Sequence, residues 1–250
     1  MLLTVRFCPQ SRYALNLHAP DERAIVTEPK QDVSSFQAVA YDKIREDIIF
    51  CRLAPGQKLS ARILEETLGL GRTPVREALV RLGQEGMVFT VPQSGTYVSK
   101  IDLQSAENAR YVRENLERSV AVECCARIDQ AGRDLLKGIL KEQAQAVHER
   151  DSLSFFILDN QFHKAMFEIA GRTQVWQWIE SCNTDLQRFR WLRTQVENLD
   201  WNAIMDQHAA LYRAITSGDT DEVSYLTVAH LHLMSAEQDS VLAAFPEYFA

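Results

Sequence analysis

The sequence predicts a mainly α-helical protein, in which three helices and a β-hairpin precede an all-α helical bundle. Apolar residues recur at helical spacing from Phe36 onward, and one short stretch, between Val88 and Ser99, reads instead as two β-strands. Glycines separate the helical segments of the second half at three positions, which are Gly132, Gly171 and Gly218. The 250 residues are enough for two ordinary domains with a sizeable core.

Composition and periodicity divide the chain into three parts. Residues 1–35 carry three prolines and no sustained periodicity, so we expect a flexible tail. Residues 36–100 form a small module with nine Lys or Arg against seven Asp or Glu, whereas residues 101–250 form the bundle with fourteen against twenty-three. Because only the module is slightly basic, we expect it alone to meet an anionic partner.

The overall composition is that of a soluble globular protein, with 46% hydrophobic and 24% charged residues. No apolar run approaches the roughly 20 residues of a membrane span, and Arg6 and Arg12 make the first segment a poor signal peptide. The five cysteines are odd in number and lack C-x-x-C spacing, which indicates free thiols in a reducing compartment. We expect a cytoplasmic protein without a membrane partner.

The first two helices of the small module are marked by their stop and start signals. The first begins near Phe36, carries Ile44 and Ile48 at helical spacing, and stops at Pro55 in "LAPGQKLS". The second is short, "ARILEETLG", and Ser60 is placed to cap its N-terminus.

A third helix and a hairpin complete the module. The helix begins at Thr73, with Pro74 in its first turn where the missing N–H costs nothing, and ends at Gly86. The runs Val88–Val91 and Thr96–Ser99 flank a Pro-Gln-Ser-Gly turn and predict two paired strands. Three helices followed by such a hairpin make a winged helix-turn-helix.

The third helix has the charge pattern of a DNA-reading helix. Three arginines fall near one side and three apolar residues supply the core face: Arg72, Arg76 and Arg81, and Val75, Leu79 and Leu82. A helix of this kind can enter the major groove, where arginine commonly reads guanine. The pattern alone is also compatible with a small helical interaction module whose arginines are solvated.

A long motif favours the DNA-binding alternative. The segment "LAPGQKLS…LGLGRTPVREALVRLGQEGMVFTVPQSGTYV" resembles the DNA-binding domain of the GntR family of bacterial transcription regulators, from about Tyr41 to Lys100. The sequence departs from the family pattern at Ala61, where Glu is frequent, and at Gly71, where Ser is usual. The resemblance implies that operator DNA is contacted by Arg62, Arg72 and Arg76, with Thr73 and Pro74 at the start of the helix and Gly95 at the wing tip.

The second half predicts a helical bundle with short connections. Asp102 can cap a long helix that runs to about Asp129. Five further helices are expected, at Arg133–Arg150, Ser152–Ala170, Thr173–Arg193, Trp201–Thr216 and Asp221–Asp239.

The stretch "LDNQFHKAMFEIAG" places Asp159 and His163 one helical turn apart, so their side chains project together. His208 and His230 lie on two other predicted helices, and one Asp with three His can converge inside a bundle. Such a set suits a divalent Zn, Ni, Mn or Fe ion. Spacing alone equally permits a surface ion pair or histidines packed in the core.

The bundle also resembles a known domain. The segments "YVRENLE", "DNQFH" and "QH…YRAITSGD", with a histidine eleven residues after Asp219, are similar to the FCD ligand-binding domain of the FadR-type branch of the GntR family, from Leu103 to about Ser240. His148 and His232 do not match its motifs. In metal-binding members these motifs supply the ligands, which implies a metal site of Asp159, His163, His208 and His230.

The same resemblance suggests Arg113 as the partner of an effector carboxylate. The alternative is an exposed arginine paired with Glu117 at i, i+4. Weaker candidates for the effector site are Arg188, Arg190 and Arg193, and we expect Phe155, Phe162 or Trp191 to line a pocket for a small ligand.

These features predict a homodimeric transcription regulator that binds operator DNA and senses a small organic acid. A two-fold dimer is expected because one winged helix reads only one half-site of a palindrome. The competing interpretation is a metalloenzyme, or a metal-storing or metal-sensing bundle, with an accessory winged helix. We expect no enzyme, because the sequence has no H-E-x-x-H, no glycine-rich phosphate loop and no motif that places a catalytic partner.

Overall fold

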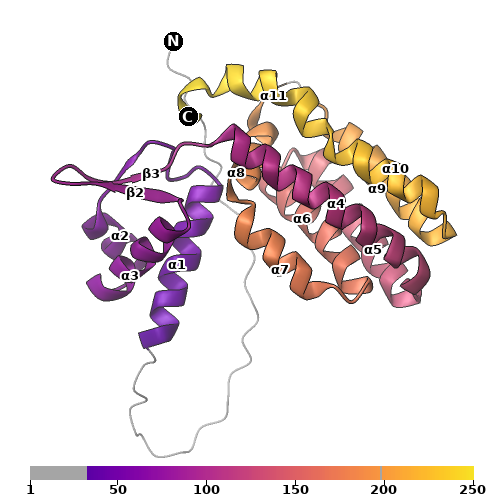
Figure 1. Cartoon of the computed structure of the whole chain (residues 1–250), viewed down its shortest axis with the longest axis horizontal. Coiled ribbons are helices and arrows are strands. Elements are labelled where there is room, and N and C mark those ends of the chain that lie inside the picture. Colours follow the sequence, from indigo (N-terminus) through magenta and orange to yellow (C-terminus); the bar gives the residue numbers. More distant parts are fainter. Residues whose placement is uncertain (1–32, 198) are drawn as a thin grey trace, which may run out of the picture. The chain divides into compact units, whose positions relative to one another are not determined.

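A computed structural model describes residues 33–197 and 199–250 (Figure 1). The tail expected over residues 1–35 lies outside these residues except for its last three positions, which already belong to the first helix. The expected class is confirmed: a winged helix-turn-helix precedes an all-α bundle. None of the helices in the described part of the chain is both long and apolar enough to cross a membrane.

The winged module contains three helices and a small antiparallel sheet. Its elements are α1 (Val33–Ile49), β1 (Lys58–Leu59), α2 (Ala61–Leu68), α3 (Arg72–Gln84), β2 (Val88–Val91) and β3 (Gly95–Val98). The strand order is β1-β3-β2, with Val88 opposite Val98 and Lys58 opposite Tyr97. The hairpin was expected, whereas β1 was not. A strand of two residues is too short to show an alternating pattern in the sequence.

Local signals and burial explain the module. The Ser60 side chain accepts a hydrogen bond from the backbone of Ile63, as the predicted N-cap requires, and Gly69 ends α2 at a φ of 64°. The core of the module comprises fully buried apolar side chains from α1, α3 and β3: Ile44, Ile48, Val75, Leu82 and Val98.

The bundle consists of eight α-helices within the described residues, followed by one short 3-10 helix. They are α4 (Leu103–Arg127), α5 (Gln130–Glu149), α6 (Ser152–Ile169), α7 (Thr173–Cys182), α8 (Thr184–Gln195), α9 (Trp201–Ser217), α10 (Thr220–Leu231), α11 (Leu233–Ala244) and η1 (Pro246–Tyr248). Five of these helices begin behind an aspartate whose side chain accepts a backbone hydrogen bond: Asp102, Asp129, Asp151, Asp200 and Asp219. Asp102 was the cap predicted for the first of them.

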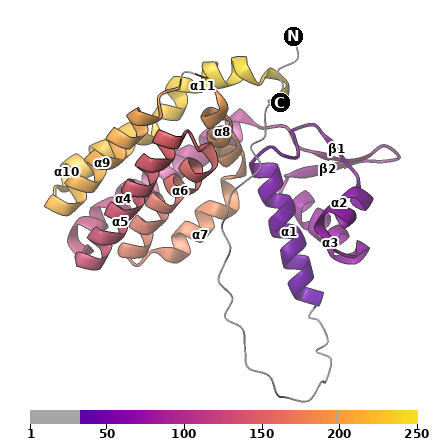
Figure 2. The same cartoon turned by 180° about the vertical axis from the view of Figure 1, so that it is seen from behind.

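One face of helix α4 packs against α6, α8, α9 and α10 (Figures 1 and 2). Helices α9 and α10 lie side by side, and α6 packs along α5. The surrounding core includes Phe162, Met166 and Trp176, none of which is exposed. Side chains on the inner faces of α4, α6, α9 and α10 are therefore directed toward the same interior.

Two of the expected helices are each divided in two. Thr173–Arg193 is interrupted at Asn183, whose backbone leaves helical geometry at φ −109° and ψ 21°. Asp221–Asp239 changes direction at His232, which keeps near-helical dihedrals of −74° and −13°. Apolar residues continue through both breaks without a glycine or proline, so the sequence carries no stop signal there.

Candidate metal centre and nucleic-acid interface

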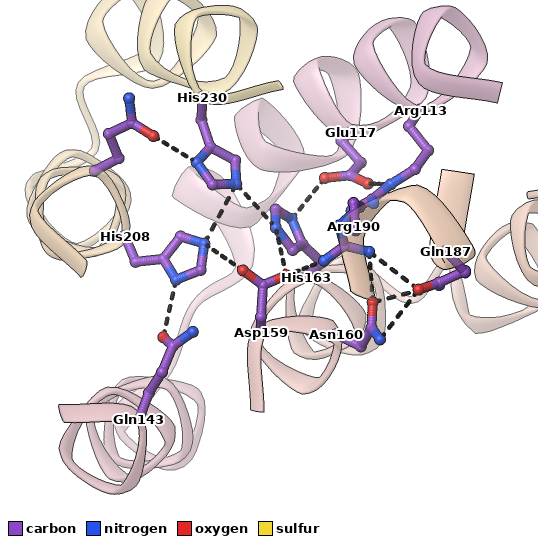
Figure 3. A network of polar contacts seen from close by, with 11 residues as sticks. Arg113, Glu117, Gln143, Asp159, Asn160, His163, Gln187, Arg190, His208 and His230 are labelled. Atoms are coloured by element: carbon purple, nitrogen blue, oxygen red, sulfur yellow. Dashed lines mark hydrogen bonds and ion pairs between the residues drawn. The ribbon is translucent and has the colours of Figure 1, made fainter. Parts of the chain in front are cut away.

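The four predicted metal ligands come together inside the bundle (Figure 3). Asp159 and His163 project from α6, His208 from α9 and His230 from α10. One ligand atom from each lies within 4.8 Å of those of the others, and all four residues are buried. The structure thus brings together residues that are up to 71 positions apart in sequence.

The ring nitrogens face one another. Nε2 of His230 lies 3.1 Å from Nε2 of His163 and 3.3 Å from Nε2 of His208. The Asp159 carboxylate completes the group, with Oδ1 3.7 Å from Nε2 of His208 and Oδ2 3.8 Å from Nε2 of His163. Nitrogens bound to one ion at about 2.0–2.1 Å would be about 3.0 Å apart in octahedral and about 3.4 Å apart in tetrahedral directions. The two separations from Nε2 of His230, 3.1 and 3.3 Å, fall in this range, whereas the Asp159 oxygens lie slightly farther from the rings.

Each histidine presents its other ring nitrogen to an oxygen acceptor. Nδ1 of His208 lies 2.9 Å from Oε1 of Gln143, and Nδ1 of His163 lies 2.7 Å from Oε2 of Glu117. Nδ1 of His230 lies 2.8 Å from Oε1 of Gln207.

Those acceptors determine where the lone pairs point. An amide oxygen next to Nδ1 requires a proton there, so Nε2 of the neutral His208 and His230 rings keeps its lone pair. These two lone pairs, Nε2 of His163 and a carboxylate then lie around a single point, which is unfavourable unless a cation lies between them. The donor set therefore fits a divalent metal ion.

Burial keeps the imidazoles of His208 and His230 neutral. It lowers the pKa of His208 to about 3 and the pKa of His230 well below its ordinary value, since a charged ring would lose its hydration. Burial raises the pKa of the Asp159 carboxyl, but the guanidinium of Arg190, together with the histidines, holds that pKa well below its usual range. The centre is therefore an ionised carboxylate with neutral His208 and His230 at neutral pH.

A cavity of about 50 Å³ adjoins the ligand cluster. Four arginines, two of the ligand histidines and five apolar side chains line it: Arg110, Arg113, Arg190, Arg193, His163, His230, Leu186, Phe189, Ile204, Leu231 and Leu233. Such a concentration of guanidinium groups beside a cation site suits an anionic ligand.

Arg113 is fully buried, and only one of its nitrogens is engaged. Nε donates to Oε1 of Glu117 at 2.5 Å, whereas neither terminal nitrogen has a hydrogen-bond partner in the described residues. The alternative of an exposed Arg113–Glu117 pair was therefore right about the pairing and wrong about exposure, since both side chains are buried. Unpaired buried donors are costly, which suggests that these two nitrogens receive an acceptor from a ligand.

The three weaker arginine candidates have different positions. Arg190 donates to Oδ2 of Asp159 and, at 2.7 Å, to Oδ1 of Asn160; burial lowers its pKa to about 10, so it remains cationic at neutral pH. Arg193 lines the cavity and pairs with Glu237. Arg188 is not among the lining residues and donates to backbone oxygens of Ser99 and Lys100 instead.

The expected aromatic lining is wrong. Phe162 stacks on the His208 ring, with 4.4 Å between ring centroids, and Phe155 stacks on Trp201 at 4.9 Å. Trp191 packs edge-on against Phe50. These rings support the centre or other parts of the core, and the apolar part of the cavity wall is formed by Phe189 and by Leu and Ile side chains from α8, α9, α10 and α11.

The expected DNA-contacting residues lie at the surface of the winged module. Arg72, Thr73 and Arg76 border one shallow hollow on α3. Arg62 on α2 is exposed and pairs with Glu66 at 2.9 Å, and Pro74 is the third residue of α3. Gly71 is the N-cap of α3 and has no side chain to cap it.

Gly95 has a structural requirement of its own. The wing turn comprises residues 92–94, so Gly95 is the first residue of β3 rather than the tip itself. Its φ of +139° is rarely adopted by other residues, and an added Cβ would lie 2.8 Å from Cε of Lys58. This position favours glycine whether or not DNA approaches it.

Comparison with known proteins identifies both parts of the chain. The profile of the bacterial regulatory proteins of the gntR family matches residues 36–98, and that of the FCD domain matches residues 110–233. An HTH-type transcriptional regulator from an unstable DNA locus of Streptomyces ambofaciens is 32% identical over 210 residues, covering 84% of this chain and 88% of the relative. The HTH-type transcriptional repressor RspR of Escherichia coli K12 is 28% identical over 210 residues, covering 84% and 92%.

The fold is shared with a solved structure as well. Escherichia coli McbR/YncC superposes with a TM-score of 0.72 at 18% identity, covering 84% of this chain and 98% of that chain. The family and the sequence relatives are transcriptional regulators rather than enzymes. The chain therefore belongs to the GntR family of bacterial transcription regulators and carries an FCD domain behind its DNA-binding winged helix.

Proposed function

We propose that this regulator is a cytoplasmic homodimer that senses a small carboxylate in a metal-containing pocket of its FCD domain and adjusts its hold on operator DNA accordingly. The observation that carries the proposal is the pair of terminal nitrogens of Arg113, which have no partner among the described residues and are buried at a cavity that His163 and His230 also line. A carboxylate would supply an oxygen anion to the Arg113 donors and to a metal ion bound by the cluster.

The residues that would hold the metal are Asp159, His163, His208 and His230. A divalent Zn, Ni, Mn or Fe ion bound by these four would have open coordination positions that attract an oxygen anion. Gln143, Glu117 and Gln207 orient the three rings through their Nδ1 atoms.

The arginines would orient the ligand. Arg113 offers two adjacent N–H donors, a geometry that matches both oxygens of a carboxylate. Arg190 is committed to Asp159 and Asn160, so we assign it a supporting position beside the ligand. The cavity of about 50 Å³ favours a short acid over one with a long apolar chain.

DNA reading is assigned to Arg62, Arg72, Thr73, Pro74, Arg76 and Gly95. Arg72 and Arg76 lie in the first turns of α3, where a recognition helix meets base edges. Arg62 is free to reach a phosphate because its side chain is 86% exposed and held only by a surface pair.

A second copy is proposed to pack on α4. Three apolar side chains on its outer side are exposed, namely Tyr111, Val112 and Leu116, and Trp178 is exposed on α7, which contacts α4. Neighbouring exposed apolar side chains of this kind mark interaction surfaces. A two-fold dimer would present two copies of α3 to a palindromic operator.

A thermal-shift screen tests the carboxylate site. Small mono-, di- and tricarboxylates are added to metal-loaded protein, chelated protein and Arg113→Ala. A true effector should raise the melting temperature of the metal-loaded wild type alone, since binding to the native state stabilises it. An acid that stabilises all three samples equally would show that neither the metal nor Arg113 forms its site.

A further inference from the structure

The linker between the winged module and the bundle is held from two sides. Arg188 of α8 donates to the backbone oxygens of Ser99 at 2.6 Å and Lys100 at 3.3 Å. From the other side, the chain's last residues form a parallel bridge along Ile101. The Ile101 N–H donates to the Tyr248 oxygen at 2.9 Å, and its carbonyl accepts from the Ala250 N–H at 3.0 Å.

The segment that makes this bridge begins at the effector cavity. Leu233, the first residue of α11, lines the cavity, and Glu237 one turn later accepts from Nε and from a terminal nitrogen of Arg193. The remaining terminal nitrogen of Arg193 is buried without a partner in the described part of the chain. Helix α11 is thus fastened to the cavity wall near its start and continues through η1 to the bridge at Ile101.

A small apolar core connects the cavity with the bridge at Ile101. It contains Ile101, Phe189, Leu192, Val241 and Phe249, all buried, so it draws on the linker, α8, α11 and the chain's last residues. Phe189 lines the cavity, and its ring centroid lies 6.4 Å from that of Phe249. Because packed interiors shift between discrete arrangements rather than deform continuously, a change at Arg193 can reach Ile101 through this core.

We propose that the residues from Leu233 to Ala250 form a latch that couples the cavity to the linker, and that a carboxylate ligand opens it by competing with Glu237 for Arg193. Arg193 has one terminal nitrogen free, whereas a carboxylate engages a guanidinium best through two. A ligand can obtain the second only from Glu237. Opening the latch would weaken the hold of the last residues on Ile101 and give the winged module more freedom.

The latch rests on the proposed carboxylate site, but its mechanical part can be tested without any ligand. Glu237→Gln keeps the shape of the side chain and removes the charge that holds Arg193. Asp239→Asn is the matched control, because Asp239 lies on the same helix, is exposed and makes no ion pair within the described residues. Hydrogen exchange of the full chain is then followed at the amides of Ile101 and Ala250.

We expect Glu237→Gln to speed exchange at both amides about fivefold or more, the lower end of ordinary coupling factors, and Asp239→Asn to leave it unchanged. Faster exchange in α11 alone, with Ile101 as in the wild type, would overturn the latch.

A second arm separates the latch from the acid sensor. Phe249→Ala removes the far end of the latch without substituting Arg193 or any residue that lines the cavity, so oxalate, succinate or citrate should still raise its melting temperature if the site is real. DNA affinity of this variant should no longer respond to an acid that changes it in the wild type. If the acid changes the DNA affinity of Phe249→Ala as much as that of the wild type, the latch is contradicted. If none of the three acids stabilises either protein, the acid site is contradicted. The hydrogen-exchange experiment then decides the latch by itself.

Discussion

His208 shows how single contacts define the centre. Its Nδ1 faces Gln143 from α5, and its ring stacks on Phe162 from α6, so both the tautomer and the plane of the imidazole are fixed. Nε2 is left facing His230 and Asp159. A ring held this firmly loses little freedom on binding an ion, which is how buried neighbours raise metal affinity.

Removing this one ring should therefore remove the metal. His208→Ala is expected to lower metal content and to lose the stability that the ion provides, about 4 kcal/mol when free metal is a thousandfold above its Kd. Elemental analysis and thermal unfolding measure the two effects.

His232→Ala is the control for that prediction. His232 follows α10, is 53% exposed and pairs with Glu114 instead of facing the cluster. It should retain wild-type metal content. Equal metal in wild type and His208→Ala would rule out the assigned centre.

The cluster of Asp159, His163, His208 and His230 could be predicted from sequence because all four belong to segments that resemble FCD motifs and two of them lie one helical turn apart. The residues around them could not. Gln143 stands on α5 without any motif, and Glu117, although it ends the segment "YVRENLE", was considered only as a partner of Arg113 at i, i+4. Their contacts with His208 and His163 depend on how α4 and α5 pack against α6 and α9, which side-chain periodicity does not specify.

At the scale of elements, short interruptions decide which residues share a face. The break at Asn183 resets the helical phase, so that Arg190 and Arg193 line the cavity while Arg188 reaches the linker. A continuous helix through this position would have placed these three arginines differently. The break at His232 likewise makes α11 a separate element. Neither interruption has a glycine or proline, which explains why the bundle was predictable in class but not in helix number.

The start of α3 offers a stability test of the same kind. Gly71 caps this helix with φ −70°, an ordinary conformation for any residue, but it has no side chain to accept a backbone hydrogen bond. Gly71→Ser should therefore stabilise the protein by about 0.5–1 kcal/mol, through a new cap and a less flexible unfolded chain. Chemical denaturation measures the change.

Gly69 lies in the same turn between α2 and α3, but serine at this position is expected to destabilise the protein. It ends α2 at φ +64°, where a side chain costs about 1–2 kcal/mol. Gly69→Ser should be destabilising by about that amount. If Gly71→Ser and Gly69→Ser shift the free energy of unfolding in the same direction, the assignment of these two caps is incorrect.

For the whole molecule, the proposed regulation requires two copies and a path between ligand and DNA. Leu116→Glu places a charge on the proposed dimer face of α4 and should weaken self-association by about tenfold or more, since a charge is costly to bury. Leu135→Glu on α5 is the control, because Leu135 is also exposed, at 44%, but lies on another helix. Analytical ultracentrifugation distinguishes the two. Dissociation by both variants, or by neither, would place the interface elsewhere.

In the proposed function, a carboxylate held by the metal and Arg113 changes operator affinity. Fluorescence anisotropy measures this change, with an operator selected from random DNA and an acid identified by thermal shift. If the ligand opens the latch, metal-loaded wild type should lose affinity on adding the acid by a factor within about 5–150, the usual range of coupling between sites. Chelated protein and Arg113→Ala should bind the operator as tightly as before and show no response. An equal response in all three proteins would contradict the account.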